Sequence, residues 1–323
     1  MSTRRQLLIL AAAASVEGAA ATAWAQAWPS RPLRLLVGFA AGGNFDLIAR
    51  LLVPALSTRL GQTVIVDNRP GAGGNIATEA LVRAAPDGYT LLLAGAANAV
   101  NATLYDKLPF RFPADVAAVA GVVRFPNVMT VSSALPVHTV AEFIAYARAH
   151  PGHVNQGSSG NGTTQHLAGE LFRSMTGVDF THVPYKGAAP AINDLLAGEV
   201  QVLFEPLPAS LSFIKAGRLR ALAVTSAARS DALPDVPAMG ESVPGYEASG
   251  WAGICAPRGT PEAVVDAVNQ AVNAILTDPL LRARLTDLGA MPMPGSAADF
   301  DKLIASETDK WARLIRAANI RPT

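Results

Sequence analysis

Apolar runs of strand length alternate with helix-like segments along most of this 323-residue chain. The apolar runs are residues 33–37, 64–66, 91–94, 200–204 and 219–224. Apolar side chains recur at helical spacing between them, for example over residues 47–56 and 141–150. This alternation predicts an α/β fold whose mainly parallel sheets are covered by helices.

Two glycine-rich turns stand at the starts of helix-like segments, more than a hundred residues apart. The first is residues 39–46 (FAAGGNFD), which follow the apolar run 33–37, and the second is residues 157–164 (GSSGNGTT). A helix start presents unpaired backbone N–H groups at the positive end of the helix dipole, so both turns favour an anion. Two such starts predict two lobes that close on one carboxylate-bearing ligand.

The apolar stretch 117–130 and the segment 245–253 are the expected crossings between the lobes. A chain that leaves one lobe and later returns forms a double-crossing hinge, which permits closure around a ligand. The predicted division is a first lobe of residues 26–125 with 252–323, and a second lobe of residues 126–251.

The N-terminus has the pattern of an export signal that ends with cleavage near Ala25. Two arginines at 4–5 precede an apolar run at 7–16, and residues 23–25 (AWA) supply small side chains for cleavage. The arginine pair leaves Sec and twin-arginine export both open. Because Glu17 interrupts the apolar run and no cysteine is near the cleavage point, we expect a soluble periplasmic protein.

Composition argues against several classes of function. The formal net charge is +1 and no basic run occurs, so nucleic acid is not expected as a partner. The single cysteine, Cys255, lies in an apolar segment and is predicted to be a buried strand thiol. No cofactor is expected, because residues 71–76 (GAGGNI) end in isoleucine where a dinucleotide-binding fingerprint needs glycine.

Catalytic and metal-binding alternatives are weaker. Ser158 and Ser159 invite a hydrolase interpretation, but neither is the centre of a G-x-S-x-G turn, and the five histidines offer no evident triad. His166 and Glu170 share a helix face, but no third metal ligand is evident, which favours a structural pair. We therefore expect no enzymatic activity, and an exported serine hydrolase that uses Ser159 is the less favoured alternative.

Seven segments, in order along the chain, resemble the substrate-binding proteins of tripartite tricarboxylate transporters, the Bug (TctC-like) family. They are residues 28–32 (WPSRP), 61–75 (GQTVIVDNRPGAGGN), 85–92 (APDGYTLL), 183–187 (VPYKG), 194–198 (DLLAG), 214–222 (IKAGRLRAL) and 256–261 (APRGTP). Each motif is weak alone, but the ordered set covers nearly the whole mature chain.

The resemblance implies a type II periplasmic-binding-protein fold with two lobes. It also implies a receptor that captures a small carboxylate: a dicarboxylate or tricarboxylate, an acidic amino acid or an aromatic acid. The expected partner is a membrane permease with one large and one small subunit, and the receptor itself is expected to be a monomer. A sensory binding module for a two-component system is the alternative, because the same closed form suits either partner.

In the family, the loop after the first strand and the Ser/Thr-Gly loop of the second lobe clamp the ligand, mainly through backbone groups and bound waters. The expected ligand-binding residues are Phe39, Gly42, Gly43, Asn44, Asp46, Ala96, Ser158, Ser159, Thr163, Tyr185 and Glu205. Asp46 is expected to fix its own loop rather than to touch the ligand.

Three departures from the family pattern bear on the ligand. Ala40 and Ala41 replace prolines that are common in the first loop, and Phe45 stands where a small residue is common. The Phe45 ring either narrows the pocket and stacks on an aromatic ligand, or points into the core. Glu205 stands where the family often has aspartate, and an acid in the pocket suits an ammonium, a hydroxyl or a water.

Overall fold

The computed structural model describes residues 28–39, 41–42, 44–105, 107–160, 162–185, 188–318 and 320–321. The export signal expected in residues 1–25, its cleavage near Ala25 and the expected site residue Gly43 lie outside the described residues. Within the described ranges, no helix is both long enough and apolar enough to cross a membrane.

One sheet has six strands in the order β11-β4-β10-β3-β1-β2. Its strands are β1 (Leu33–Val37), β2 (Val64–Asn68), β3 (Thr90–Gly95), β4 (Val116–Phe125), β10 (Gly250–Pro257) and β11 (Met291–Pro292). β1 is parallel to β2 and β3, whereas β10 is antiparallel to β3 and β4. We call this sheet and its covering helices the first lobe.

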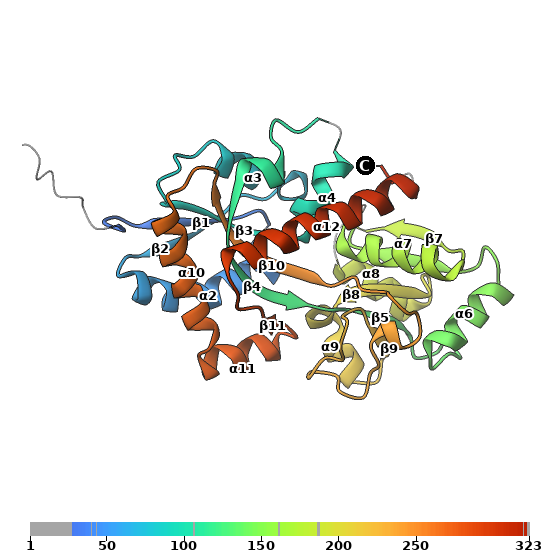
Figure 1. Ribbon diagram of the computed structural model, residues 1–323. Coiled ribbons are helices and arrows are strands. Elements are labelled where there is room, and N and C mark those ends of the chain that lie inside the picture. Colours follow the sequence, from blue (N-terminus) through green and yellow to red (C-terminus); the bar gives the residue numbers. More distant parts are fainter. Residues whose placement is uncertain are drawn as a thin grey trace, which may run out of the picture.

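Helices cover both faces of the six-stranded sheet (Figure 1). One face carries α2 (Asn44–Leu60), α10 (Glu262–Leu276) and α11 (Pro279–Asp287), and the other carries α3 (Asn75–Val82), α4 (Ala96–Leu104), α5 (Phe112–Asp115) and part of α12 (Ala297–Ala317). Successive strand residues face opposite ways, so Leu91 and Leu93 join the core on the α2 side while Leu92 joins the other core. Cys255 is buried in β10, as predicted.

The second sheet has five strands in the order β7-β6-β8-β5-β9. They are β5 (Asn127–Ser132), β6 (Asn155–Ser158), β7 (Thr181–Pro184), β8 (Val202–Pro206) and β9 (Leu219–Val224). β6 is parallel to β7 and β8, whereas β5 is antiparallel to β8 and β9. With α6 (Val140–Ala149) and α7 (Thr164–Thr176) on one face and α8 (Ala188–Ala197) and α9 (Leu207–Lys215) on the other, it forms the second lobe. The predicted α/β class and two-lobe fold are confirmed, but both sheets are mixed rather than mainly parallel, because the strands near the crossings between the lobes pair antiparallel with their neighbours.

The chain crosses between the lobes in two adjacent segments, as predicted. β4 ends at Phe125, β5 begins two residues later, and the returning strand β10 pairs with β4 up to Phe125. Thr225 ties the two crossings together. Its hydroxyl accepts the Asn127 N–H at 2.9 Å, and its carbonyl accepts the Ala248 N–H at 3.0 Å. These bonds hold the hinge strands side by side.

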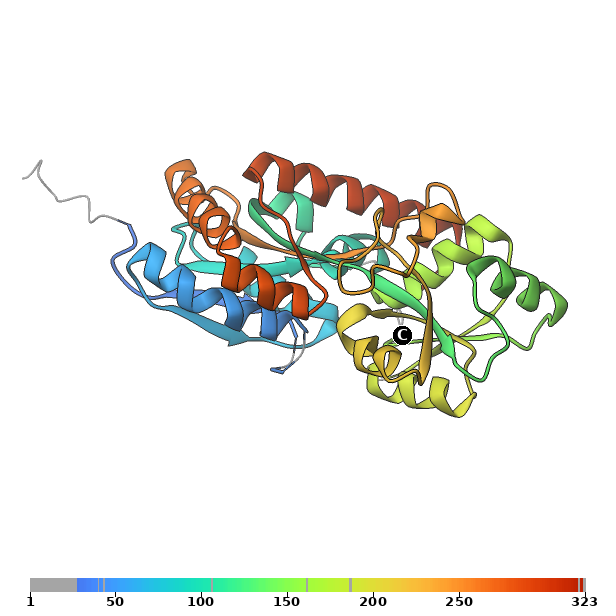
Figure 2. The same cartoon turned by 90° about the horizontal axis from the view of Figure 1, so that it is seen from below.

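A third connection, which the sequence pattern did not reveal, is α12. This helix runs along both lobes (Figures 1 and 2), with Phe300 in a first-lobe core and Trp311 in the second-lobe core. The lobe limits expected from the sequence, 26–125 with 252–323 and 126–251, stay a prediction, and α12 contacts the cores on both sides of them.

Candidate ligand-binding cleft

A cavity of about 620 Å³ is lined by residues of both lobes, and we call it the cleft. Its walls come from the carboxyl ends of strands in both sheets. Phe39 comes shortly after β1, Ala96 follows β3, Ser159 follows β6, and Pro206 ends β8. Loops at the carboxyl ends of strands are the common ligand sites of α/β proteins.

The first-lobe loop is held by the carboxylate of Asp46, which is 2% exposed. Asp46 Oδ2 accepts the Gly42 N–H at 2.8 Å and Arg50 Nε–H at 2.9 Å, and its Oδ1 accepts from Asn68 Nδ2 at 3.0 Å. The bonds from Arg50 and Gly42 lower the pKa of Asp46 to about 2. Asp46 thus fixes the loop, and the Gly42 N–H is already engaged rather than open to a ligand.

Three phenylalanines form an aromatic wall on the first-lobe side of the cleft. The ring centroids of Phe39 and Phe45 are 4.8 Å apart, and Phe45 meets Phe125 edge-on at 6.1 Å. A Cβ at Gly95 would lie 2.2 Å from Cζ of Phe45, so only glycine leaves room for this ring. The ring of Phe45 therefore both lines the cleft and packs against the first-lobe core, and stacking on an aromatic ligand stays a prediction.

The second-lobe loop leads into α7, whose first turn faces the cleft. Thr163 is the N-cap, and its Oγ1 accepts the His166 N–H at 3.4 Å and donates to the Gly160 carbonyl at 2.7 Å. Thr163, Thr164 and Gln165 line the cleft with Ser159. The Ser159 Oγ is buried and has no hydrogen-bond partner among the described residues. This end of the cleft therefore offers the backbone N–H groups of the first turn and the Ser159 hydroxyl as donors.

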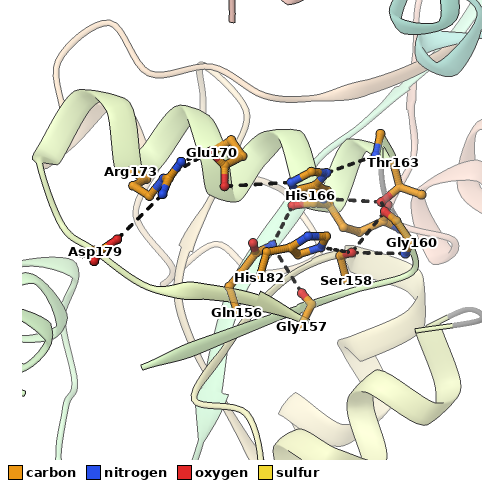
Figure 3. Close-up of polar contacts among 12 residues, drawn as sticks. Gln156, Gly157, Ser158, Gly160, Thr163, His166, Glu170, Arg173, Asp179 and His182 are labelled. Atoms are coloured by element: carbon orange, nitrogen blue, oxygen red, sulfur yellow. Dashed lines mark hydrogen bonds and ion pairs between the residues drawn. The ribbon is translucent and has the colours of Figure 1, made fainter. Parts of the chain in front are cut away.

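Two stacked histidines lie behind the second-lobe loop (Figure 3). The rings of His166 and His182 are 3.7 Å apart and nearly parallel, at 3°. His166 Nδ1 accepts the Gly162 N–H at 3.0 Å, and His182 Nε2 lies 2.6 Å from Ser158 Oγ. Burial lowers the pKa of His166 to about 3 and that of His182 to about 4. Both rings are neutral at pH 7, and both buttress the loop.

Ser158 supports the loop from behind and does not line the cleft. Its residue is fully buried, and its Oγ donates to the Gly160 carbonyl and accepts the Gly160 N–H, both at 3.1 Å. The contact with His182 was not foreseen from the sequence and resembles a nucleophile–base pair, but burial keeps the Ser158 Oγ away from any substrate.

The pair formed by His166 and Glu170 is part of a structural network. Their side chains are 3.9 Å apart, and Glu170 also accepts two hydrogen bonds from Arg173, which in turn lies 3.7 Å from Asp179 (Figure 3). In the described part of the chain, no group of three or more histidine, cysteine or acidic side chains is placed to hold a metal ion.

Six of the expected site residues line the cleft: Phe39, Gly42, Asn44, Ala96, Ser159 and Thr163. Asp46 and Ser158 lie directly behind it and hold its loops. Tyr185 does not line it, and its hydroxyl donates instead to Asp194 Oδ2 at 2.6 Å. Burial and this bond raise the pKa of Tyr185 to about 12, so the hydroxyl stays protonated.

Glu205 lies inside the second lobe rather than in the cleft wall. It is fully buried, and its carboxyl oxygens have no hydrogen-bond partner among the described residues. Burial raises the pKa of Glu205 to about 7, although the nearby Gln165 side chain acts in the opposite direction. Its neighbour Pro206, not Glu205, reaches the cleft.

No described residue that lines the cleft carries a charged side chain. The polar groups are backbone amides, hydroxyls and the amides of Asn44 and Gln165, while most of the remaining surface is apolar. Sequence reasoning missed Phe125, Pro206 and Gln165 as lining residues. The first two stand at strand ends, and that position was the available signal.

Sequence comparison identifies the family. Residues 48–320 match the family described as tripartite tricarboxylate transporter family receptor. The chain belongs to this family. Protein BugT of Bordetella pertussis is 36% identical over 319 residues, which is 98% of each chain. Receptors of this family are periplasmic solute-binding proteins rather than enzymes, which sets aside the serine hydrolase alternative.

Solved structures of relatives share the fold. The structure of R. palustris Rpa4515 with adipate has a TM-score of 0.82 and 39% identity, covering 92% of this chain and all of its own. MatC (Rpa3494) from Rhodopseudomonas palustris with bound malate has a TM-score of 0.77 and 31% identity, covering 89% of this chain and all of its own.

Proposed function

We propose that this protein captures a small carboxylate in the cleft and delivers it to the permease of a tripartite tricarboxylate transporter. The observation that carries the proposal is the cleft itself, where the start of α7 and the hydroxyl of Ser159 face an uncharged wall. The relatives solved with adipate and with malate support a carboxylate as the ligand class.

The first turn of α7 binds the carboxylate in this proposal. Its backbone N–H groups have no partners inside the helix, and the helix dipole adds favourable charge, so no arginine is needed. Ser159 adds a hydroxyl donor, while Asn44 contributes from the opposite loop. Ordered waters bridge what remains, at little entropic cost.

Closure follows from the hinge. The paired crossings allow the lobes to rotate towards each other, which brings the start of α2 and the start of α7 to the same ligand. The closed form then presents a surface made of both lobes, and the permease recognises that surface. Export through the signal in residues 1–25 and a monomeric state belong to the same proposal.

A thermal-shift assay tests the capture step. Residues 26–323 are unfolded and refolded to remove co-purified ligand, then screened against carboxylates and neutral analogues. A ligand at a hundred times its dissociation constant adds about 2.7 kcal/mol to the free energy of unfolding, which raises the melting temperature measurably. We expect stabilisation by at least one carboxylate and none by its amide. Stabilisation only by neutral or cationic compounds would refute the proposal.

Delivery needs a separate measurement. Uptake of the bound carboxylate into vesicles that contain a tripartite permease is expected only when the loaded receptor is present. A receptor that binds its ligand but never supports uptake would favour the sensory role instead.

A further inference from the structure

Polar and apolar groups are segregated in the cleft. The donors gather around the start of α7, in the Ser159 hydroxyl and the first turn of the helix at Thr164 and Gln165. Facing them across the cleft are three aromatic rings, Phe39, Phe45 and Phe125, joined by smaller apolar residues such as Ala96. One end of a bound ligand thus contacts hydrogen-bond donors, and its body contacts the aromatic rings and other apolar side chains.

We propose that the cleft selects carboxylates with an apolar body, either an aromatic ring or a polymethylene chain, over hydroxylated acids such as malate and citrate. This inference rests on the proposed function, because it names the ligand class of the same site. It goes further by assigning the selection to the aromatic wall, with Phe45 as the specificity-determining residue.

The aromatic wall provides contact area but no hydrogen bonds. A ligand hydroxyl pressed against the three rings loses its water without gaining a partner, which weakens binding roughly tenfold or more for each hydroxyl. A methylene or ring carbon in the same place gains about fourfold in affinity through burial. Both effects favour the unsubstituted apolar acid.

Phe45 holds the central position in this wall. Its ring contacts both Phe39 and Phe125, and it fits because Gly95 has no side chain. Neither nearby carboxyl group is available to a ligand in the cleft, because Asp46 is bound by Arg50 and Glu205 is buried outside the cleft wall. A tricarboxylate would therefore bring excess negative charge to a cleft without a cationic side chain.

Isothermal titration calorimetry on the stripped protein tests the inference with benzoate, adipate, malate and citrate. We expect benzoate or adipate to bind at least tenfold more tightly than malate and citrate, and the better of the two identifies the body as a ring or a chain. Malate or citrate binding as tightly as both apolar acids would overturn the inference and leave the proposed function standing. Binding of none of the four, together with no carboxylate hit in the thermal-shift screen, would remove both.

The variant Phe45→Thr tests the assignment to the wall. We expect the affinity for the preferred apolar acid to fall about tenfold and that for malate to change less than threefold, so that selectivity narrows. Phe39→Thr is a second variant with the same expectation if Phe45→Thr does not fold. Phe213→Thr is the matched control, a partly buried phenylalanine of α9 outside the cleft, and it should leave the ratio unchanged. Equal loss for all ligands in Phe45→Thr would overturn the role of its ring.

Discussion

The loops at the two sides of the cleft each lead into a helix, but different groups hold them in place. In the first lobe, a charged carboxylate, Asp46, ties the Gly42 N–H to Arg50. In the second lobe, neutral groups hold the loop in place: Thr163 caps α7, and His166 accepts the Gly162 N–H. The first loop thus keeps a negative charge beside its helix start, although Arg50 compensates it, whereas the second loop has no charge next to the cleft. For an anionic ligand, this difference assigns the carboxylate to the second lobe and the ligand body to the first.

The largest effect is expected from Asp46→Ala. The substitution removes the hydrogen bonds that Asp46 accepts from Gly42, Arg50 and Asn68 and leaves Arg50 without its ion-pair partner, so the free energy of unfolding should fall by about 3 kcal/mol. Carboxylate affinity should fall about a hundredfold, because the aromatic wall loses its support. Urea unfolding and calorimetry measure both quantities.

Glu79→Ala is the matched control for Asp46→Ala. Glu79 pairs with Arg83 at the same four-residue spacing in the same lobe, but at the surface. It should cost less than about 1 kcal/mol and leave binding unchanged. If both variants behaved alike, the Asp46 network would be an ordinary surface pair.

The second lobe also contains a buried carboxyl group, that of Glu205. The Glu205→Gln variant tests how the ionisation of this group affects the free energy of unfolding. Its pKa is raised to about 7 in the folded state, so its favourable contribution is fully present below pH 4.5 and is lost as the pH rises through 7. At pH 8 the glutamine variant should be more stable than the wild type by roughly 2–3 kcal/mol, and at pH 4.5 nearly equal to it. Denaturant unfolding across this range measures the difference. Parallel wild-type and Glu205→Gln curves would place an unseen partner beside Glu205.

Both loops could be predicted from the sequence because their signals are local. A strand, a glycine-rich turn and an amphipathic helix are adjacent in the chain, and Gly42 and Thr163 stand where that pattern placed them. The first crossing had a local signal in the apolar stretch 117–130, and the second was placed because a chain that leaves one lobe must return.

The remaining features depend on tertiary contacts. Nothing local places His182 of β7 against His166 of α7, or brings Phe125 next to Phe45. Glu205 illustrates the limit of reasoning from a strand end, because the alternation of side chains buries it while its neighbour Pro206 reaches the cleft. Adjacent residues at a strand end point to opposite faces of the sheet. Only the register of the strand in the sheet determines which of them reaches the cleft.

Acid is expected to destabilise the second-lobe loop before the first-lobe loop. His166 and His182 have pKa values lowered to about 3 and 4, so their contribution is present above about pH 6.5 and is lost as the pH falls through these values. Asp46 has a pKa lowered to about 2, so its contribution to the first loop is fully present above pH 3.8 and is lost only as the pH falls towards 2. Between pH 6.5 and 5, the amide-exchange protection factor of Gly162 should fall at least about tenfold while that of Gly42 stays constant.

The histidine variants sharpen this acid prediction. His166→Gln should weaken the pH dependence of Gly162 protection, because glutamine does not titrate and only His182 is left to take up a proton, whereas exposed His153→Gln should leave it intact. Equal loss of protection at both glycines would mean that acid opens the whole molecule rather than the second loop.

The smallest effect distinguishes two adjacent serines in the second loop. Ser159 Oγ is buried beside the cleft without a partner in the described residues, so Ser159→Ala should leave the melting temperature of the stripped protein unchanged or slightly raised. Carboxylate affinity should fall three- to tenfold, because the ligand supplies the missing acceptor. Ser158→Ala should do the reverse: it should lower the melting temperature, since Ser158 Oγ contacts Gly160 and His182, and affect binding only through the loop. A lower melting temperature with unchanged affinity in Ser159→Ala would move the carboxylate away from the second lobe and reverse the assignment drawn from the two loops.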